Sequence, residues 1–279
     1  MKNNNLPIGL FDSGVGGLTV LAAMRRRLPG ESVLYLGDTA RLPYGAKSPA
    51  TIRRYALQCA EQLVGRGIKM LVVACNTASA VALPVLMETF PLLPVLGVVE
   101  PGAAAGCLAS ASGRIAVIGT KSTIEGGAYQ RAILALRPEA EITALPCPLF
   151  VPLAEEGLVS GPIAEAVAAH YLGAVFAPDS AHRVAAGRPD CLVLGCTHFP
   201  LLQATISRVV GGGVTLVDSA ATTAAAVENV LRDRELGAAA AAPVATRFLT
   251  TDDPERFAQV GRCFLGMDIN PGAVQLIDL

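Results

Sequence analysis

The sequence predicts an α/β protein in which parallel sheets are covered by helices. Short apolar runs of strand length alternate with segments of helix length through most of the chain. Nearly all of these runs are unalternating and rich in β-branched residues, as strands buried on both faces are. Two segments of the first half are also echoed in the second half, which indicates two halves of similar architecture.

The expected strands and helices follow one another in the order that crossover connections between parallel strands need. The expected strands are residues 8–11, 33–36, 70–74, 95–98, 115–118, 142–144, 191–194 and 214–217. The expected helices are residues 17–28, 48–66, 77–87, 123–136, 161–175, 201–209 and 220–236.

The internal echo has two parts. Residues 8–14 resemble residues 115–120, and residues 71–77 resemble residues 192–198. In the second pair, four apolar residues are followed by a cysteine and then by a threonine within two positions. Two α/β halves, each with a cysteine just past the carboxyl end of a strand, explain this better than chance similarity between apolar strands.

Length and charge narrow the class of protein. The 279 residues suffice for two ordinary domains. Charged residues make up 16% of the chain, and 22 basic against 23 acidic side chains leave a net charge of −1. This composition excludes a disordered protein and argues against a nucleic-acid-binding protein, which should carry a clustered basic excess.

The chain is expected to be cytoplasmic and not to enter a membrane. Residues 1–10 lack the long apolar region of a signal peptide. Residues 70–87 are uncharged, but they contain Asn76, Ser79 and Pro84 and divide better into a strand, a turn and a helix. Seven cysteines, an odd number, without an export signal suggest reduced thiols in the cytoplasm.

Polar residues follow four of the expected strands. Ligands of parallel α/β proteins bind outside the carboxyl ends of the strands, so a functional site is expected there. The residues at these strand ends are Asp12 and Ser13, then Asp38, Thr39, Tyr44 and Gly45, then Cys75, Asn76 and Thr77, and finally Cys196, Thr197 and His198.

The glycine-rich residues 12–17 do not fit a nucleotide-binding motif. Thr19 stands where a dinucleotide loop needs its third glycine, and no Walker lysine follows. The segment therefore predicts a tight turn between a strand and a helix, whose N–H groups face a small anion such as a carboxylate. A purely structural glycine turn is the alternative.

Two of the seven cysteines have a different sequence context from the other five. Cys75 and Cys196 each end an apolar strand and precede residues that can cap a helix, and the positive potential at a helix amino end favours a thiolate. The others are interpreted as small core residues, with a loop position as an alternative for the proline-flanked Cys147. These five are Cys59, Cys107, Cys147, Cys191 and Cys263.

A zinc site built from Cys191, Cys196 and His198 is not expected. Five residues of strand separate the two cysteines by about 16 Å, whereas zinc ligands lie about 2.0 to 2.3 Å from the metal. Cys196 and His198 alone are an incomplete ligand set. No cofactor motif and no metal site are therefore predicted.

Two activated thiols from two halves of a molecule suit the inversion of a stereocentre. One base cannot easily reach both faces of a tetrahedral carbon, so inversion needs two acid/base groups, one a thiolate and the other a thiol. Asp12 and His198 could relay these protons, and Asp12 could instead meet a substrate ammonium. Ser13, Asn76 and Thr197 would donate hydrogen bonds to a substrate carboxylate.

Seven segments, spread in order over almost the entire chain, resemble the glutamate racemase family. They contain the two cysteines, the glycine-rich turn and the expected strand ends. The segments are residues 11–20, 35–45, 74–79, 99–102, 148–157, 195–202 and 217–220.

The resemblance implies a cofactor-independent racemase that interconverts L- and D-glutamate and supplies D-glutamate for peptidoglycan synthesis in the bacterial cytoplasm. It implies that Cys75 and Cys196 are opposed acid/base groups, assisted by a glutamate of the Glu-Glu-Gly segment, for which Glu155 is preferred to Glu156. A homodimer is also implied. The implied substrate contacts are Asp12, Ser13, Tyr44, Gly45, Asn76, Thr77, Thr197 and His198.

The fold implied by the resemblance consists of two doubly wound parallel-sheet domains related by a pseudo-twofold, with the active site between them. The first domain would be discontinuous and contain residues 1–99 together with residues 213–279. The second would contain residues 100–212.

Three other functions are weaker alternatives. A sister racemase acting on aspartate would use the same pair of thiols. A non-catalytic amino-acid-binding protein would not need both thiols together with Asp12 and His198. A cysteine hydrolase would use one thiol as its nucleophile and leave the other unexplained.

Overall fold

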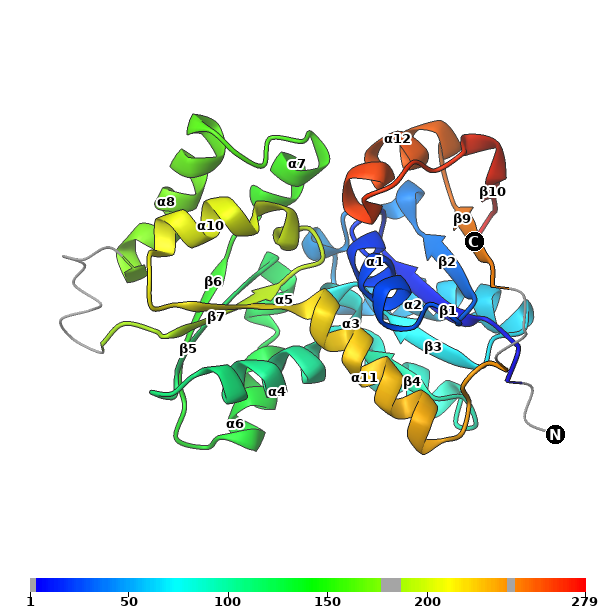
Figure 1. The fold of residues 1–279 in the computed structure, drawn as a ribbon, viewed down its shortest axis with the longest axis horizontal. Helices are drawn as coiled ribbons and strands as arrows, with labels where there is room; N and C mark the ends of the chain where they lie inside the picture. Colours follow the sequence, from blue (N-terminus) through cyan, green and yellow to red (C-terminus); the bar gives the residue numbers. More distant parts are fainter. Residues whose placement is uncertain (1–3, 177–186, 240–243) are drawn as a thin grey trace. The chain divides into compact units, whose positions relative to one another are not determined.

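The computed structural model describes residues 4–176, 187–239 and 244–279, which form two compact units (Figure 1). The first unit comprises Met1–Val98 and Ala220–Leu279, and the second comprises Val99–Ser219. The chain returns to the first unit seven residues later than the sequence predicts. The reason is that the strand at Thr215–Asp218 pairs with the strand at Cys191–Gly195 and so belongs to the second unit.

The first unit is built on a six-stranded sheet in the order β10-β9-β2-β1-β3-β4, and every pair of neighbours is parallel. The strands β1, β2 and β3 are buried at every position, which agrees with their unalternating sequences. The strands are β1 (Ile8–Asp12), β2 (Val33–Gly37), β3 (Met70–Val73), β4 (Val95–Gly97), β9 (Thr246–Thr250) and β10 (Val274–Leu276).

Helices cover this sheet, with α1 packed on α12 and α2 packed on α3. The helices are α1 (Leu18–Arg27), α2 (Pro49–Gly65), α3 (Asn76–Thr89), α11 (Ser219–Asp233) and α12 (Pro254–Leu265), with 3₁₀ turns η1 (Thr39–Arg41), η2 (Tyr44–Ala46) and η4 (Pro271–Ala273).

The second unit is built on a four-stranded parallel sheet in the order β6-β5-β7-β8. Helices α8 and α10 lie on one side of this sheet and α4 and α6 on the other (Figure 1). The strands are β5 (Arg114–Gly119), β6 (Glu141–Pro146), β7 (Cys191–Gly195) and β8 (Thr215–Asp218). The helices are α4 (Val99–Ala109), α5 (Lys121–Glu125), α6 (Ala128–Leu136), α7 (Phe150–Glu155), α8 (Pro162–Phe176) and α10 (Gln203–Val210), with the 3₁₀ turn η3 (Phe199–Leu202).

The two sheets share one strand order. The run β2-β1-β3-β4 of the first sheet corresponds to β6-β5-β7-β8 of the second. The echoed sequence segments form β1 and β3 in one sheet and β5 and β7 in the other, and each of these pairs is hydrogen-bonded. The prediction of two parallel-sheet α/β domains is confirmed.

Several elements differ from the sequence prediction. The expected helix at 123–136 is two helices, because the chain turns at Gly126 and Gly127, where Gly127 has a φ of +66°. The expected helix at 201–209 begins as the 3₁₀ turn η3. Strands β9 and β10 and helices α4, α7 and α12 were not predicted. Within the described ranges, no helix is both long enough and apolar enough to span a membrane.

Candidate functional site

The thiol of Cys75 and the hydroxyl of Ser13 meet at the carboxyl edge of the first sheet. Phe11 of β1 is the register partner of Val73 of β3, and the Ala74 N–H donates to the Phe11 carbonyl at 2.9 Å. The residues that follow the two strands therefore emerge side by side. The Cys75 Sγ donates to the Ser13 Oγ at 3.5 Å.

Cys75 itself is the N-cap of α3. Its sulfur accepts a hydrogen bond from the Ala78 N–H at 3.4 Å. Asn76 and Thr77, which the sequence suggested as capping residues, are the first two residues of the helix, and both are buried. The thiol thus lies at the positive amino end of a fourteen-residue helix, as expected. The difference is that the sulfur itself caps the helix, and not the side chains of the residues that follow it.

The Asp12 carboxylate lies in the turn that follows β1. It is fully buried, and its Oδ2 accepts from the Gly14 N–H at 3.0 Å. Helix α1 starts one residue after Gly17, where an added Cβ would lie 2.6 Å from the Asp12 Cβ and 3.0 Å from the Ala74 Cβ. Because such distances are impossible, this turn requires glycine at position 17. The glycine-rich segment is a tight strand-to-helix turn, as predicted.

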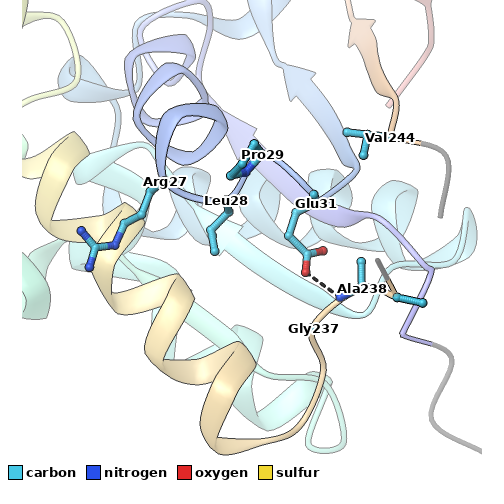
Figure 2. Close-up of a pocket in the computed structure, with 9 residues that line it drawn as sticks. Arg27, Leu28, Pro29, Glu31, Gly237, Ala238 and Val244 are labelled. Carbon is cyan, nitrogen blue, oxygen red and sulfur yellow. Dashed lines mark hydrogen bonds between the residues drawn. The ribbon is translucent and has the colours of Figure 1, made fainter. Parts of the chain in front are cut away.

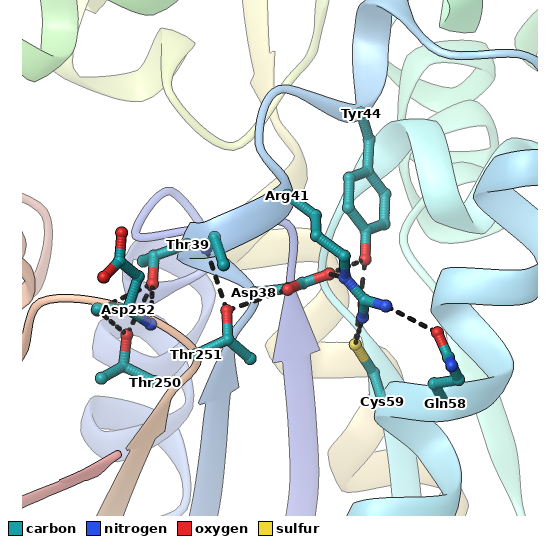
Figure 3. A network of polar contacts seen from close by, with 10 residues as sticks. Asp38, Thr39, Arg41, Tyr44, Gln58, Cys59, Thr250, Thr251 and Asp252 are labelled. Atoms are coloured by element: carbon teal, nitrogen blue, oxygen red, sulfur yellow. Dashed lines mark hydrogen bonds and ion pairs between the residues drawn. The ribbon is translucent and has the colours of Figure 1, made fainter. Parts of the chain in front are cut away.

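The loop after β2 is fixed by a buried network around Asp38 (Figure 3). The Asp38 carboxylate is fully buried and accepts hydrogen bonds from the Arg41 Nε at 2.7 Å, from the Thr251 Oγ1 at 2.9 Å and from the Tyr44 hydroxyl. Burial raises the pKa of Tyr44, and the negative charge of Asp38 raises it further. The Tyr44 hydroxyl therefore stays protonated and donates into the protein interior.

Helix α2 supplies the other side of this network. The Arg41 guanidinium donates to the Gln58 Oε1 at 2.6 Å and reaches the Cys59 Sγ at 3.8 Å, while its Cζ lies 4.0 Å from the centre of the Tyr55 ring. Asp38 was placed at a strand end where the site was expected but was given no role, and Arg41 was not selected. The sequence did contain a signal for this ion pair, because Asp38 and Arg41 carry opposite charges three residues apart and lie close to Tyr44 in the chain.

The hydroxyl of Tyr44 is thus used inside the protein, which leaves its main chain for other partners. Tyr44 and Gly45 open the 3₁₀ turn η2, and the first N–H groups of such a turn have no acceptor within it. Tyr44 and Gly45 were predicted to contact the substrate. Their main-chain N–H groups are better suited to such a contact than the Tyr44 phenol is.

In the second unit, Cys196 follows β7 directly, beside the end of β5. Gly119 and Gly195 are register partners at the ends of these strands. The Cys196 sulfur is buried and lies 3.9 Å from the His198 Nδ1, and the Thr197 Oγ1 lies 3.4 Å from the same nitrogen. Thr197 does not cap a helix, because the following 3₁₀ turn begins at Phe199 and its N-cap residue is His198, which makes no side-chain cap hydrogen bond.

Glu155 is paired with His198. The Glu155 Oε1 lies 3.0 Å from the His198 Nε2, and both side chains are largely buried. Glu155 is the last residue of α7, where the negative end of the helix disfavours a carboxylate, so the imidazole N–H is a stabilising partner. Glu156, the alternative considered from the sequence, is the residue after the helix.

An aromatic cluster holds α7 against the turn that contains His198. The Phe150 ring packs edge-on against Phe199, with centroids 5.2 Å apart and an interplanar angle of 87°, and against Tyr171 at 5.4 Å and 77°. The Tyr171 hydroxyl also accepts from the Leu149 N–H at 3.2 Å. This packing fixes the start of α7, the helix whose last residue is Glu155.

Thr120 is a further candidate that the sequence analysis did not select. It follows Gly119 of β5 as Ser13 follows Asp12 of β1, so the pairing of β5 with β7 brings its backbone to the edge where Cys196 emerges. The Thr120 Oγ1 accepts from the Thr123 N–H at 3.4 Å and caps α5. The echo between the two halves already aligned Ser13 with Thr120.

All seven cysteines are free. Burial raises the pKa of Cys147 to about 12, with the nearby Cys196 adding to the shift, and burial likewise raises the pKa of Cys191 to about 12. Cys59 and Cys191 are core thiols, as predicted. Cys147 is buried too, but it lies in the loop between β6 and α7, the alternative position considered for it. The prediction was wrong for Cys263, which is exposed on the outer face of α12, and for Cys107, which is only partly buried.

Within the described residues, no three His, Cys, Asp or Glu side chains are grouped so that they could hold a metal ion. Cys191 opens β7 and Cys196 follows its end, so the strand keeps the two residues apart, as the spacing suggested.

Comparison with known proteins places this chain in a class of isomerases. A family model described as Asp/Glu/Hydantoin racemase matches residues 16–227. The chain belongs to this racemase family, which confirms the resemblance found in the sequence.

Its similar relatives within the family are glutamate racemases. The glutamate racemase of Geobacter metallireducens is 49% identical over 93% of this chain and 92% of that protein. The crystal structure of the Francisella tularensis glutamate racemase in complex with D-glutamate has a TM-score of 0.87 at 35% identity and covers 99% of this chain and 98% of that one. The Thermus thermophilus glutamate racemase, in complex with beta-chloro-D-alanine, has a TM-score of 0.86 at 45% identity and covers 100% and 99%.

Proposed function

We propose that this protein interconverts L- and D-glutamate without a cofactor, with Cys75 and Cys196 as its two acid/base groups. The observation that carries the proposal is the duplicated placement of the thiols. Each unit has the same strand order, and each sets one buried cysteine just past the carboxyl end of the corresponding strand, β3 or β7. Inversion of a carbon requires such a matched pair.

In the proposed reaction, one sulfur acts as a thiolate and removes the α-proton from one face of glutamate. The other sulfur, as a thiol, gives its proton to the opposite face of the resulting carbanion. The first sulfur ends as a thiol and the second as a thiolate, so the next turnover in the same direction requires proton exchange with solvent. Because the two thiols are chemically alike, the reaction can run in either direction.

Each thiol has an acid/base companion in its own unit. Cys75 contacts Ser13 and follows the strand beside Asp12, and Cys196 lies near the His198–Glu155 pair. These companions would orient the thiols and exchange protons with them. Asp12 has a second possible role, since a buried carboxylate could also meet the substrate ammonium.

Hydrogen-bond donors at the carboxyl ends of the strands in each unit suit the two carboxylates of glutamate. In the first unit these are Ser13, Asn76, Thr77 and the N–H groups of Tyr44 and Gly45, and in the second they are Thr197 and His198. The similar relatives are glutamate racemases, and one related structure holds D-glutamate. Stabilisation of the carbanion would rest on such donors and on desolvation of the bound substrate.

We further propose the biological setting that the family resemblance implies. The D-glutamate would supply peptidoglycan synthesis in the bacterial cytoplasm, and the enzyme would act as a homodimer. The two compact units would be its two domains.

Incubation with L-glutamate in D₂O tests the reaction. The D-glutamate formed should carry deuterium at the α-carbon, after dialysis against a chelator and without added pyridoxal phosphate. The measurement is α-proton loss by NMR together with chiral chromatography. Faster incorporation into aspartate than into glutamate would contradict the choice of substrate, and D product that retains the substrate proton in full would contradict exchangeable thiols.

Glu155→Gln should lower kcat by about tenfold to a hundredfold, less than the loss expected for a proton-transfer group itself. The amide keeps the shape of the side chain but removes the negative charge that pairs with His198. Glu156→Gln is the matched control, because Glu156 is the adjacent residue beyond the end of α7. Steady-state racemisation rates of the two variants decide the question, and equal losses would contradict a specific role for Glu155.

A further inference from the structure

Tyr35 lies beneath the turn that carries Asp12. It is the third residue of β2, in register with Leu10 of β1, and its side chain is fully buried. Its ring packs against two phenylalanines, with centroids 6.3 Å from Phe248 and 5.9 Å from Phe257, which also contact each other. These contacts fix the direction of the ring, so the position of the hydroxyl is set by the core of the first unit.

The hydroxyl of Tyr35 is linked to the Asp12 carboxylate through one residue. It donates to the Gly14 carbonyl at 2.9 Å, and the Gly14 N–H donates to the Asp12 Oδ2 at 3.0 Å. Glycine has more backbone freedom than any other residue, so this turn depends on such external bonds for its conformation. A Cβ at Gly17 would lie 3.1 Å from the Tyr35 oxygen and 2.6 Å from the Asp12 Cβ, which shows how closely the turn is packed on the hydroxyl.

The hydroxyl is a donor that does not lose its proton. Burial raises the pKa of Tyr35 well above its ordinary value, and the negative charges of Asp12 and Cys75 raise it further, whereas the Leu18 N–H opposes this in part. The same charges show that the phenol is electrostatically close to both groups. Tyr35 is therefore suited to orienting them and unsuited to exchanging protons with the substrate.

We propose that Tyr35 is a positioning residue for catalysis, whose hydroxyl holds the Gly14 peptide and through it the direction of the Asp12 carboxylate beside Cys75. The proposal rests on the racemase function proposed above. It assigns no contact between Tyr35 and the substrate, because Tyr35 acts through the turn.

The test is Tyr35→Phe in the full-length enzyme. This change removes one oxygen atom and leaves the ring contacts with Phe248 and Phe257. We expect kcat to fall about tenfold to a hundredfold in both directions, as a small misplacement of a catalytic group does, while KM for glutamate changes by less than about threefold. Leu231→Ala is the control, because it removes a buried apolar side chain near the end of α11 and leaves the Tyr35 ring contacts and hydroxyl in place. It should lower Tm and leave kcat nearly unchanged.

A double-mutant cycle separates positioning from general destabilisation. If Tyr35 acts through Asp12, then Tyr35→Phe should lower kcat by less than about twofold in an Asp12→Asn background. Multiplicative losses would overturn the proposal, as would a Tyr35→Phe enzyme with the kcat of the parent. Either result leaves the racemase function standing if the parent enzyme exchanges the α-proton, whereas a parent enzyme that does not racemise glutamate overturns both proposals.

Discussion

Cys75→Ala and Cys196→Ala should each lower kcat for glutamate racemisation by about 10²- to 10⁴-fold, the contribution of a positioned acid/base group. Either change leaves one face of the α-carbon without a proton donor or acceptor. Cys147→Ala is the matched control, because Cys147 is a buried cysteine near Cys196 whose raised pKa, about 12, keeps it a neutral thiol. Its kcat should remain close to that of the parent, and comparable losses in all three variants would contradict the assignment.

The single-thiol variants offer a second measurement that does not depend on turnover. The remaining thiol can still remove the α-proton from one enantiomer and return a solvent deuteron to the same face. Cys75→Ala should therefore exchange only one enantiomer of glutamate in D₂O, and Cys196→Ala only the other. Exchange of the same enantiomer by both variants would mean that the two sulfurs do not act on opposite faces.

The parts of the site that were predicted are those that a regular sheet controls. Parallel strands bring their carboxyl ends to one edge, so a residue just past a strand can be placed from the sequence alone. Cys75 and Ser13 meet because β1 and β3 are neighbours, and Cys196 emerges beside β5 because the second half repeats that pairing. The echo in the sequence was sufficient for this prediction.

One contact of the site was not predicted, and the residue in another, Glu155, was preferred only from the family resemblance. These contacts depend on a distant segment and on the choice between two neighbouring residues. The Asp38 carboxylate is completed by Thr251, which lies 213 positions away and follows a strand that was not predicted. The choice of Glu155 over Glu156 depends on where α7 ends, and one residue decides which carboxylate faces His198. Neither has a local sequence signal.

Physical reasons explain why several strands and helices were not predicted from the sequence. Strand β9 contains Arg247 and is only partly buried, and β10 has three residues, two of them exposed. Helix α4 contains Pro101 and Gly102, which argue against a helix unless the proline falls in its first turn, as it does here. Helix α12 could have been found, because Asp253 caps it ahead of Pro254 and its buried residues recur at helical spacing.

Lys69→Met should destabilise the first unit by about 3 to 5 kcal/mol, because it leaves a buried carboxylate without its partner. The Lys69 Nζ lies 2.5 Å from the Glu31 Oε2, and the side chains are only 2% and 7% exposed. The ammonium also donates to the carbonyls of Asn4 and Leu236 at 2.8 Å each. Differential scanning calorimetry should show Tm lowered by about 6 to 20 °C, at about 2 to 4 °C per kcal/mol for a protein of this size.

In this variant the Glu31 carboxylate would stay buried without its charged partner, because it also accepts a hydrogen bond from a second segment of the chain. Glu31 Oε1 accepts from the Ala238 N–H at 2.8 Å, at the edge of a pocket of about 290 Å³ (Figure 2). Lys69→Met with Glu31→Gln should recover part of the lost stability, since the amide keeps an acceptor for Ala238 without a buried charge. Arg27→Met breaks the exposed pair with Glu228 and should cost at most about 1 kcal/mol. If Lys69→Met cost no more than Arg27→Met, burial would not be what makes the Lys69–Glu31 pair important.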